Sequence, residues 1–270
     1  MDVNASREEG YARGLARAGA GALIFGFPLL MTMEMWELGV HMDRFRLALF
    51  VAVTAGVVFG LSRFAGFRDD TTFADDALDA LAALLVGVVV SAALLAVMGL
   101  IGPGTAFREG LGMIAVQAAP ASMGAVLANK QLQQGMNRAA KEDRAGYLGQ
   151  LFLMAAGALF FAFNVAPTEE MILIGFKMTP WHAVVLVLLS LLALHALVFT
   201  VGFAGQHDRE SHLRAFLHFT FAGYGVALLV SLYVLWTFGR LDSGVSEAIR
   251  AVVVLGFPAA LGAALARLVV

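Results

Sequence analysis

The sequence predicts an all-α membrane protein of about eight transmembrane helices, arranged as two parallel four-helix repeats. Three observations support this prediction: an apolar composition, a series of long apolar segments, and a motif that occurs twice. Of the 270 residues, 60% are hydrophobic and 14% are charged, and the mean hydropathy is +0.81. Soluble domains carry about a quarter charged residues, and one of this length could not bury so much apolar surface. A lipid bilayer solvates apolar helix faces, so the composition favours a membrane protein.

Apolar segments of about 17 to 25 residues are long enough to cross a bilayer as helices, which satisfy their own backbone hydrogen bonds there. Eight such segments occur, at about residues 18–39, 45–62, 77–101, 109–128, 147–167, 180–202, 214–238 and 247–268. The first segment follows three arginines, as a signal peptide would. It is too long for one, lacks a clear cleavage site and has a counterpart later in the chain. We therefore expect it to be retained as a span.

The distribution of basic residues predicts the orientation. Twelve of the 18 Lys and Arg residues fall on the side of the N-terminus and six on the other side. Cytoplasmic loops carry an excess of Lys and Arg, so we expect both termini to be cytoplasmic. The longest polar stretch, residues 129–146, would then be a cytoplasmic connector between a first repeat, residues 1–128, and a second, residues 147–270.

One motif appears in both halves of the chain. Residues 21–39 read GALIFGFPLLMTMEMWELG and residues 157–175 read GALFFAFNVAPTEEMILIG, with nine of nineteen positions identical at an offset of 136. The sequences of the last spans of the two halves also match at several positions, at an offset of 138 residues. Each half has an even number of spans, so both halves enter the membrane from the same side. This predicts parallel repeats related by a pseudo-two-fold axis along the membrane normal.

The motif also carries a resemblance. Residues 164–170, NVAPTEE, together with MTMEMWELG in the first half, resemble a family of bacterial integral membrane proteins that has no assigned function. The resemblance covers most of the chain. It implies a multi-pass protein of the bacterial inner membrane, and it supplies neither an activity nor site residues.

Four glutamates form the main candidate site, because ionisable residues within spans are costly and usually face the protein interior or water. They are Glu34, Glu37, Glu169 and Glu170. On a helix, Glu34, Glu37 and His41 share one face. With Glu170 they could hold Mn²⁺ or Zn²⁺, while carboxylates alone would suit Ca²⁺ or Mg²⁺. The alternative is that these side chains lie in the outer headgroup layer and are hydrated.

Prolines beside this cluster predict breaks in the first and fifth spans. Pro28 and Pro167 each remove a backbone donor, and the run from Pro167 to Glu170 is typical of a new helix start. A broken helix at membrane depth is tolerated where it lines a cavity. Freed carbonyls near Asn164, with the hydroxyls of Thr32 and Thr168, could then help the carboxylates to bind a cation. A kink covered by neighbouring helices is the alternative.

Other polar residues within the spans give weaker indications. Gln117 precedes Pro120, whose repeat partner is Pro258, and these prolines indicate kinked helices that serve packing or gating. His195 and His218 could be axial haem ligands, but hydrogen-bonded interior histidines are more common. We therefore expect no cofactor beyond a bound cation.

The acidic loop 69–79 does not have the spacing of an EF-hand. Its last aspartates precede the third span, where negative charge favours a helix start.

These observations favour a cation transport protein, either a channel or a cation–proton exchanger, with Glu34 and Glu170 at the ion site and Glu37 and Glu169 behind them. The alternative is a non-transporting sensor or scaffold subunit. The expected partners are the lipid bilayer and an inorganic cation, with a homo-oligomer left open. A net charge of −2 argues against nucleic acid. The chain contains no nucleophile, P-loop or zinc-protease motif, so we do not expect an enzyme.

Overall fold

The computed structural model describes residues 3–65, 72–132, 147–200, 216–241 and 244–269, and within these ranges every regular element is a helix. The chain divides into two compact units, Met1–Met136 and Asn137–Val270, which we call the first and second unit. The boundary falls within the predicted connector 129–146, of which residues 133–146 lie outside the described ranges.

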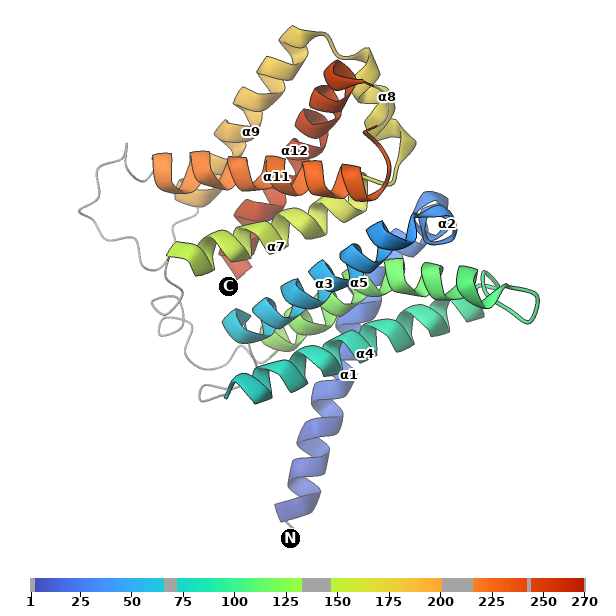
Figure 1. Cartoon of the computed structure of the whole chain (residues 1–270). Helices are drawn as coiled ribbons and strands as arrows, with labels where there is room; N and C mark the ends of the chain where they lie inside the picture. Colours follow the sequence, from blue (N-terminus) through green and yellow to red (C-terminus); the bar gives the residue numbers. More distant parts are fainter. Residues whose placement is uncertain (1–2, 66–71, 133–146, 201–215, 242–243, 270) are drawn as a thin grey trace. The chain divides into compact units, whose positions relative to one another are not determined.

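The first unit is built around its last helix. Its helices are α1 (Val3–Leu30), α2 (Met33–His41), α3 (Arg44–Ala65), α4 (Phe73–Val97) and α5 (Phe107–Leu132). Helix α5 packs against all four others and is the most buried span of the unit. Figure 1 shows α3, α4 and α5 running side by side while α1 crosses them.

The second unit repeats this plan. Its helices are α7 (Tyr147–Val165), α8 (Glu169–Lys177), α9 (Pro180–Thr200), a π-helix η1 (Phe216–Phe221), α11 (Ala222–Thr237) and α12 (Val245–Val269). Helix α12 packs against α7, α8, α9 and α11 and is the most buried span (Figure 1). The helices of the two units thus follow the same order around an equivalent central helix.

The spans agree with the predicted fold class. Seven described helices are long and apolar enough to cross a membrane, and the pair Ala12–Leu30 and Met33–His41, bent by 87°, makes an eighth candidate if it is counted as one broken span. The first predicted segment, residues 18–39, is thus broken, as Pro28 indicated, but the break lies after the proline and not at it. Helix α1 ends at Leu30, two residues after Pro28, which itself lies inside the helix, and the chain turns at Met31 and Thr32 before α2 begins.

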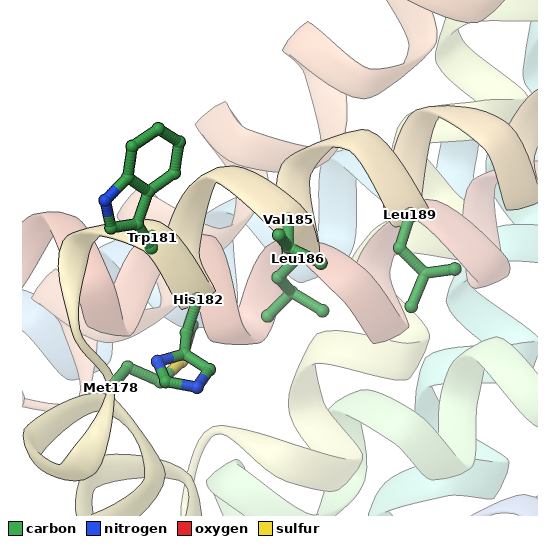
Figure 2. Close-up of a pocket in the computed structure, with 6 residues that line it drawn as sticks. All are labelled: Met178, Trp181, His182, Val185, Leu186 and Leu189. Atoms are coloured by element: carbon green, nitrogen blue, oxygen red, sulfur yellow. The ribbon is translucent and has the colours of Figure 1, made fainter.

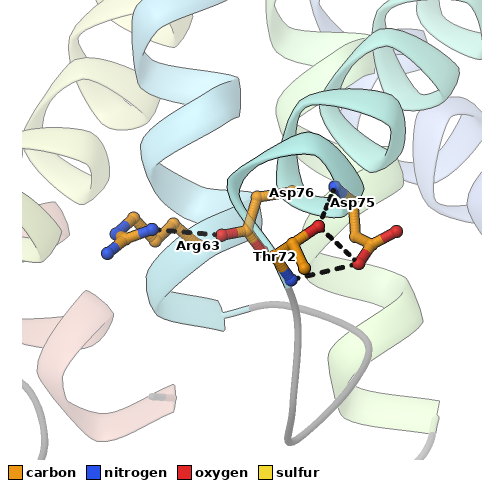
Figure 3. Close-up of polar contacts among 4 residues, drawn as sticks. All are labelled: Arg63, Thr72, Asp75 and Asp76. Atoms are coloured by element: carbon orange, nitrogen blue, oxygen red, sulfur yellow. Dashed lines mark hydrogen bonds and ion pairs between the residues drawn. The ribbon is translucent and has the colours of Figure 1, made fainter.

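The acidic residues before α4 have structural roles. Figure 3 shows the hydroxyl of Thr72 accepting from the Asp75 backbone N–H, while the Asp75 carboxylate accepts from Thr72, which forms a capping box. Buried Asp76 pairs with Arg63 of α3 at 3.3 Å. A capped start satisfies free N–H groups of the first turn, which explains why α4 begins several residues before the predicted span.

Small residues let α1 and α7 approach the central helices closely. A Cβ atom at Gly21 would overlap the Gly124 carbonyl and the side chain of Ala128. The second unit makes the same contact, between Gly157 and the carbonyl of Gly262 with the side chain of Ala266. Small residues at such crossings are common in membrane proteins. Gly21 and Gly157 are 136 residues apart, and Gly124 and Gly262 are 138 apart. These are the offsets of the sequence repeat, so the matching contacts support the predicted repeat.

Candidate site at two helix breaks

The acidic motif lies directly after a break in each unit. The α1–α2 corner comprises residues 30–32, and the α7–α8 corner comprises residues 166–168. The hydroxyl of Thr32 donates to the Leu29 carbonyl at 2.7 Å, and that of Thr168 donates to the Val165 carbonyl at 2.9 Å. The backbone N–H groups of both threonines donate to the same carbonyls. Both short helices have nine residues, so the two corners are built alike.

Both corners lie within the length of the central helices. Leu30 packs in one apolar cluster with Met113, and a Cβ atom at Gly39 would meet the backbone of Gly112 and Met113. Gly112 and Met113 lie five and six positions after the start of α5, or about 8–9 Å of helix rise. In the second unit Gly175 lies against Ala251 of α12, which is six positions into that helix. Each short helix therefore packs within the first two turns of a central helix, and in the first unit Leu30 at the corner does so too.

The carboxylates that follow the corners differ in exposure. Glu34 is half-buried, whereas Glu37, Glu169 and Glu170 are exposed. His41 is exposed as well, and its Nδ1 lies 3.2 Å from the Glu37 carbonyl oxygen. Among the described residues, no three His, Cys, Asp or Glu side chains come together to hold a metal ion.

The first unit therefore does not gather Glu34, Glu37 and His41 into a ligand set. Their helix geometry explains this, because His41 turns back towards its own backbone and Glu37 points to the exposed side of α2. Convergence of Glu34 with Glu170 involves both units and stays a prediction.

Asn164 has a local role. Its Nδ2 donates to the Phe160 carbonyl at 2.8 Å, one turn earlier in α7. This bond fixes the side-chain amide against its own helix, and its Oδ1 remains as an acceptor near the α7–α8 corner.

Sequence reasoning missed one residue of the α7–α8 corner, Arg240. Its Nη2 donates to the Pro167 carbonyl at 2.7 Å. Helix α11 ends just before it, with Gly239 at φ 70°, and Arg240 N donates back to the Leu235 carbonyl. The signal that could have found it is a lone arginine directly after a glycine at the end of an apolar span, where a helix C-terminus is typical.

The first unit has the same helix end without the arginine. Helix α4 ends with Gly99 at φ 74°, and Leu100 N donates to the Leu95 carbonyl, as at Arg240 at an offset of 140. Leu100 packs in the apolar cluster of Leu30, Leu95 and Met113. The α1–α2 corner is therefore covered by an apolar side chain where the α7–α8 corner receives a guanidinium.

Several of the polar side chains buried in the first unit lack hydrogen-bond partners among the described residues, although Asp76 does not. Gln117 is 1% exposed, and neither atom of its amide has a hydrogen-bond partner among the described residues. The same holds for the buried hydroxyls of Thr54, Ser62 and Ser122. Prolines Pro120 and Pro258 lie inside α5 and α12, as predicted.

The serine and threonine hydroxyls that are buried in the second unit are bonded, whereas the hydroxyls of Tyr224 and Tyr233 have no partner among the described residues. Ser190, Ser231 and Thr237 each donate to the carbonyl four residues earlier. The hydroxyl of Thr220, in η1, lies 2.9 Å from His195 Nδ1. His195 is thus the hydrogen-bonded interior histidine that the sequence favoured, and the side chain of His218 lies outside the described residues.

One pocket of the second unit lies away from the acidic motif. Figure 2 shows it along the first turns of α9, lined by Met178, Trp181, His182, Val185, Leu186 and Leu189. His182 Nδ1 lies 2.7 Å from the Thr179 hydroxyl oxygen, so its polar edge is held at the helix start. Aromatic residues with a polar edge above apolar turns are typical of a lipid-facing surface near the membrane boundary.

The long apolar helices, the buried central helices and the broken first span define a multi-pass integral membrane protein. Residues 14–270 match the profile of a family described as "Putative integral membrane protein (DUF2391)". The chain belongs to this family, as the resemblance in the motif implied. Comparisons with curated proteins and with solved structures gave no match.

Proposed function

We propose that this protein moves a small inorganic cation across the bacterial inner membrane, with both termini in the cytoplasm. The observation that carries the proposal is the pair of matched corners, each within the length of a central helix and each followed by carboxylates in the first helical turn. Discontinuous helices in transporters place backbone carbonyls and helix ends at ion sites.

The charges at the corners fit a cation. Glu34 and Glu170 occupy equivalent positions in the two nine-residue helices, at an offset of 136. Acidic side chains raise the local cation concentration and replace part of the lost hydration. Since Glu169, Glu170 and Glu37 are exposed and Glu34 is half-buried, we assign them to the entrance of the pathway, where an ion is still partly hydrated.

A second candidate is a non-transporting sensor or scaffold subunit. The exposure of three of the four glutamates favours it, because hydrated carboxylates in the headgroup layer need no ion pathway. In that case the corners would only shorten α1 and α7 and orient α3 and α9.

The test is ion flux into liposomes that contain the purified protein. Wild type would be compared with Glu34→Gln and Glu170→Gln, and Glu109→Gln serves as the control because Glu109 is an exposed carboxylate in the first turn of α5. K⁺, Na⁺, Ca²⁺, Mn²⁺ and H⁺ would be measured with an imposed potential, which drives a channel, or with a pH gradient, which drives a proton exchanger.

We expect wild-type flux of one of these cations, a reduction of at least tenfold in both corner variants, and no change in Glu109→Gln. Absence of flux for every cation would overturn the proposal. Flux that is equal in all four proteins would overturn the assignment of the glutamates and favour the scaffold candidate.

A further inference from the structure

Gln117 lies between two residues of α5 that pack against the end of α1. Met113, Gln117 and Ala121 are spaced by four residues, so they form one stripe along α5. Met113 shares an apolar cluster with Leu30, and Ala121 lies against Gly26, with 3.1 Å between its Cβ and a Cβ built on the glycine. The amide between them is therefore directed at residues 26–30, immediately before the α1–α2 corner.

The position of this amide is costly unless it has a partner. Gln117 lies ten residues after the start of α5, or about 15 Å of helix rise, which is the middle of the span Phe107–Ala128. A buried amide without a hydrogen bond loses its hydration with nothing to replace it, which destabilises the folded protein. A side chain that is 1% exposed and has no partner among the described residues thus points to a ligand.

The last turn of α1 provides further oxygen atoms. Four carbonyls at the end of a helix lack helical donors. Two of these carbonyls accept hydrogen bonds: the N–H of Met31 donates to the Phe27 carbonyl, and the N–H of Thr32 donates to the Leu29 carbonyl. The carbonyls of Pro28 and Leu30 are left without such a bond, and of these two residues Leu30 is buried in the cluster with Met113, whereas Pro28 is exposed.

The second unit shows what kind of group such a corner holds. There the guanidinium of Arg240 donates to the Pro167 carbonyl, so a cation of the protein itself occupies the α7–α8 corner. At the offset of 140, the first unit has Leu100 in place of Arg240. At the offset of 138, the second unit has buried Leu255 in place of Gln117. Each unit therefore has one polar group for its corner, a cationic group in the second and a neutral amide in the first.

We propose that the α1–α2 corner binds one monovalent inorganic cation through the Oε1 atom of Gln117 and the carbonyls of the last turn of α1. Neutral oxygen atoms that replace a hydration shell suit K⁺ or Na⁺, whereas divalent ions usually require carboxylates. The identity of the ligand as a cation rests on the proposed transport function, in which Glu34 lies at the entrance and Gln117 is further along the pathway. The bound ion contacts the carbonyls of the α1–α2 corner, as the guanidinium of Arg240 contacts the Pro167 carbonyl in the second unit.

Thermal unfolding in detergent tests this binding without transport. The protein would be melted in KCl, NaCl and N-methylglucamine chloride at equal ionic strength. A ligand that binds only the folded state stabilises it, so we expect K⁺ or Na⁺ to raise the melting temperature saturably, by roughly 5 °C at a hundredfold excess over the dissociation constant.

Two variants make the test specific to the corner. Gln117→Leu copies the second unit and should abolish the cation-dependent shift. Leu100→Arg places a guanidinium where Arg240 lies in the second unit, so it should also abolish the shift while it raises the melting temperature in N-methylglucamine. Leu255→Met is the matched control in α12 and should keep the full shift.

The outcomes separate this inference from the proposed function. If the wild-type protein transports a cation but has the same melting temperature in all three salts, no cation binds beside Gln117. The inference is then wrong, while the proposed function stands. A saturable shift that persists in Gln117→Leu also overturns it. A wild-type shift that both variants abolish, in a protein that shows no flux, supports the cation site and refutes transport.

Discussion

The two units share a framework and differ in the chemistry of one corner. Both place a nine-residue helix after a threonine that bonds the preceding helix, and both hold that region against a central helix through glycine contacts. They differ at two matched pairs, Leu100 with Arg240 and Gln117 with Leu255. Backbone contacts between small residues tolerate little change, whereas side chains that point into a corner can be exchanged without altering the helices around them.

The buried serine and threonine hydroxyls of the two units also differ, while the tyrosine hydroxyls do not follow this difference. In the second unit the buried serine and threonine hydroxyls bond carbonyls of their own helices or His195, whereas the hydroxyls of Tyr224 and Tyr233 have no partner among the described residues. In the first unit Thr54, Ser62 and Ser122, like Gln117, have no partner among the described residues. A polar interior with free hydrogen-bonding capacity is expensive in a membrane. Both units therefore contain buried polar atoms without partners, and Gln117 differs from the others in lying between the two residues of α5 that pack near the α1–α2 corner.

Enlarging the close glycine contacts should have the largest effect and should affect both units alike. A leucine at Gly21 or Gly157 would collide with a backbone carbonyl of the central helix, and we expect each substitution to lower the free energy of unfolding by about 3 kcal/mol. The measurement is the melting temperature and the yield of monodisperse protein in detergent.

Gly56→Ala in α3 and Gly225→Ala in α11 are the controls, because a Cβ atom at either position meets nothing within 4 Å. Alanine is the better helix former by about 1 kcal/mol, so these variants should be neutral or more stable. A wild-type melting temperature in Gly21→Leu but not in Gly157→Leu would contradict the equivalence of the two contacts.

Removing the guanidinium should affect the second unit alone. Arg240→Met deletes the bond to the Pro167 carbonyl, and hydrogen bonds to charged groups contribute about 1.5–3 kcal/mol. We expect a loss of about 2 kcal/mol, measured by thermal unfolding. Leu100→Met at the matched position keeps the apolar packing of the first unit and should cost less than about 1.5 kcal/mol. Equal losses in the two variants would mean that the corner carbonyl does not need its cationic donor.

The smallest effects are expected from two matched substitutions, one at Thr32 and one at Thr168. Thr32→Val and Thr168→Val each delete one hydroxyl that donates to the preceding helix, which is worth about 1 kcal/mol. The two melting temperatures should fall by similar amounts. A clearly larger effect of Thr32→Val would indicate that its hydroxyl also serves the ion site proposed for the first unit.

Much of the fold could be predicted because hydropathy acts locally. Each apolar segment must form a helix to satisfy its backbone in lipid, so span positions follow from composition alone, and seven helices with one bent pair correspond to the eight segments. The break at Thr168 was indicated by Pro167, which is a strong local signal. The break at Thr32 was placed less well, since Pro28 remains inside α1 and the helix ends at Leu30.

The candidate site was less predictable. The motif identified Glu34 and Glu170 and their matched threonines, but no local rule connects them with Arg240, which is 73 residues from Pro167 in the chain. Gln117 was noticed only as a neighbour of Pro120. Its importance depends on which face of α5 is buried against α1, and periodicity does not reveal that face in a helix that is apolar on all sides.

The sequence by itself thus determined the class of protein, the number of spans and the recurrence of one acidic motif, because composition and short-range backbone rules are sufficient for these. Only the tertiary structure decided that His41 turns back to its own helix, that Arg240 reaches the α7–α8 corner, and that the amide of Gln117 is buried without a partner. The physical reason is that hydrogen-bond partners and burial are set by the packing of helices from distant parts of the chain, which hydropathy does not encode.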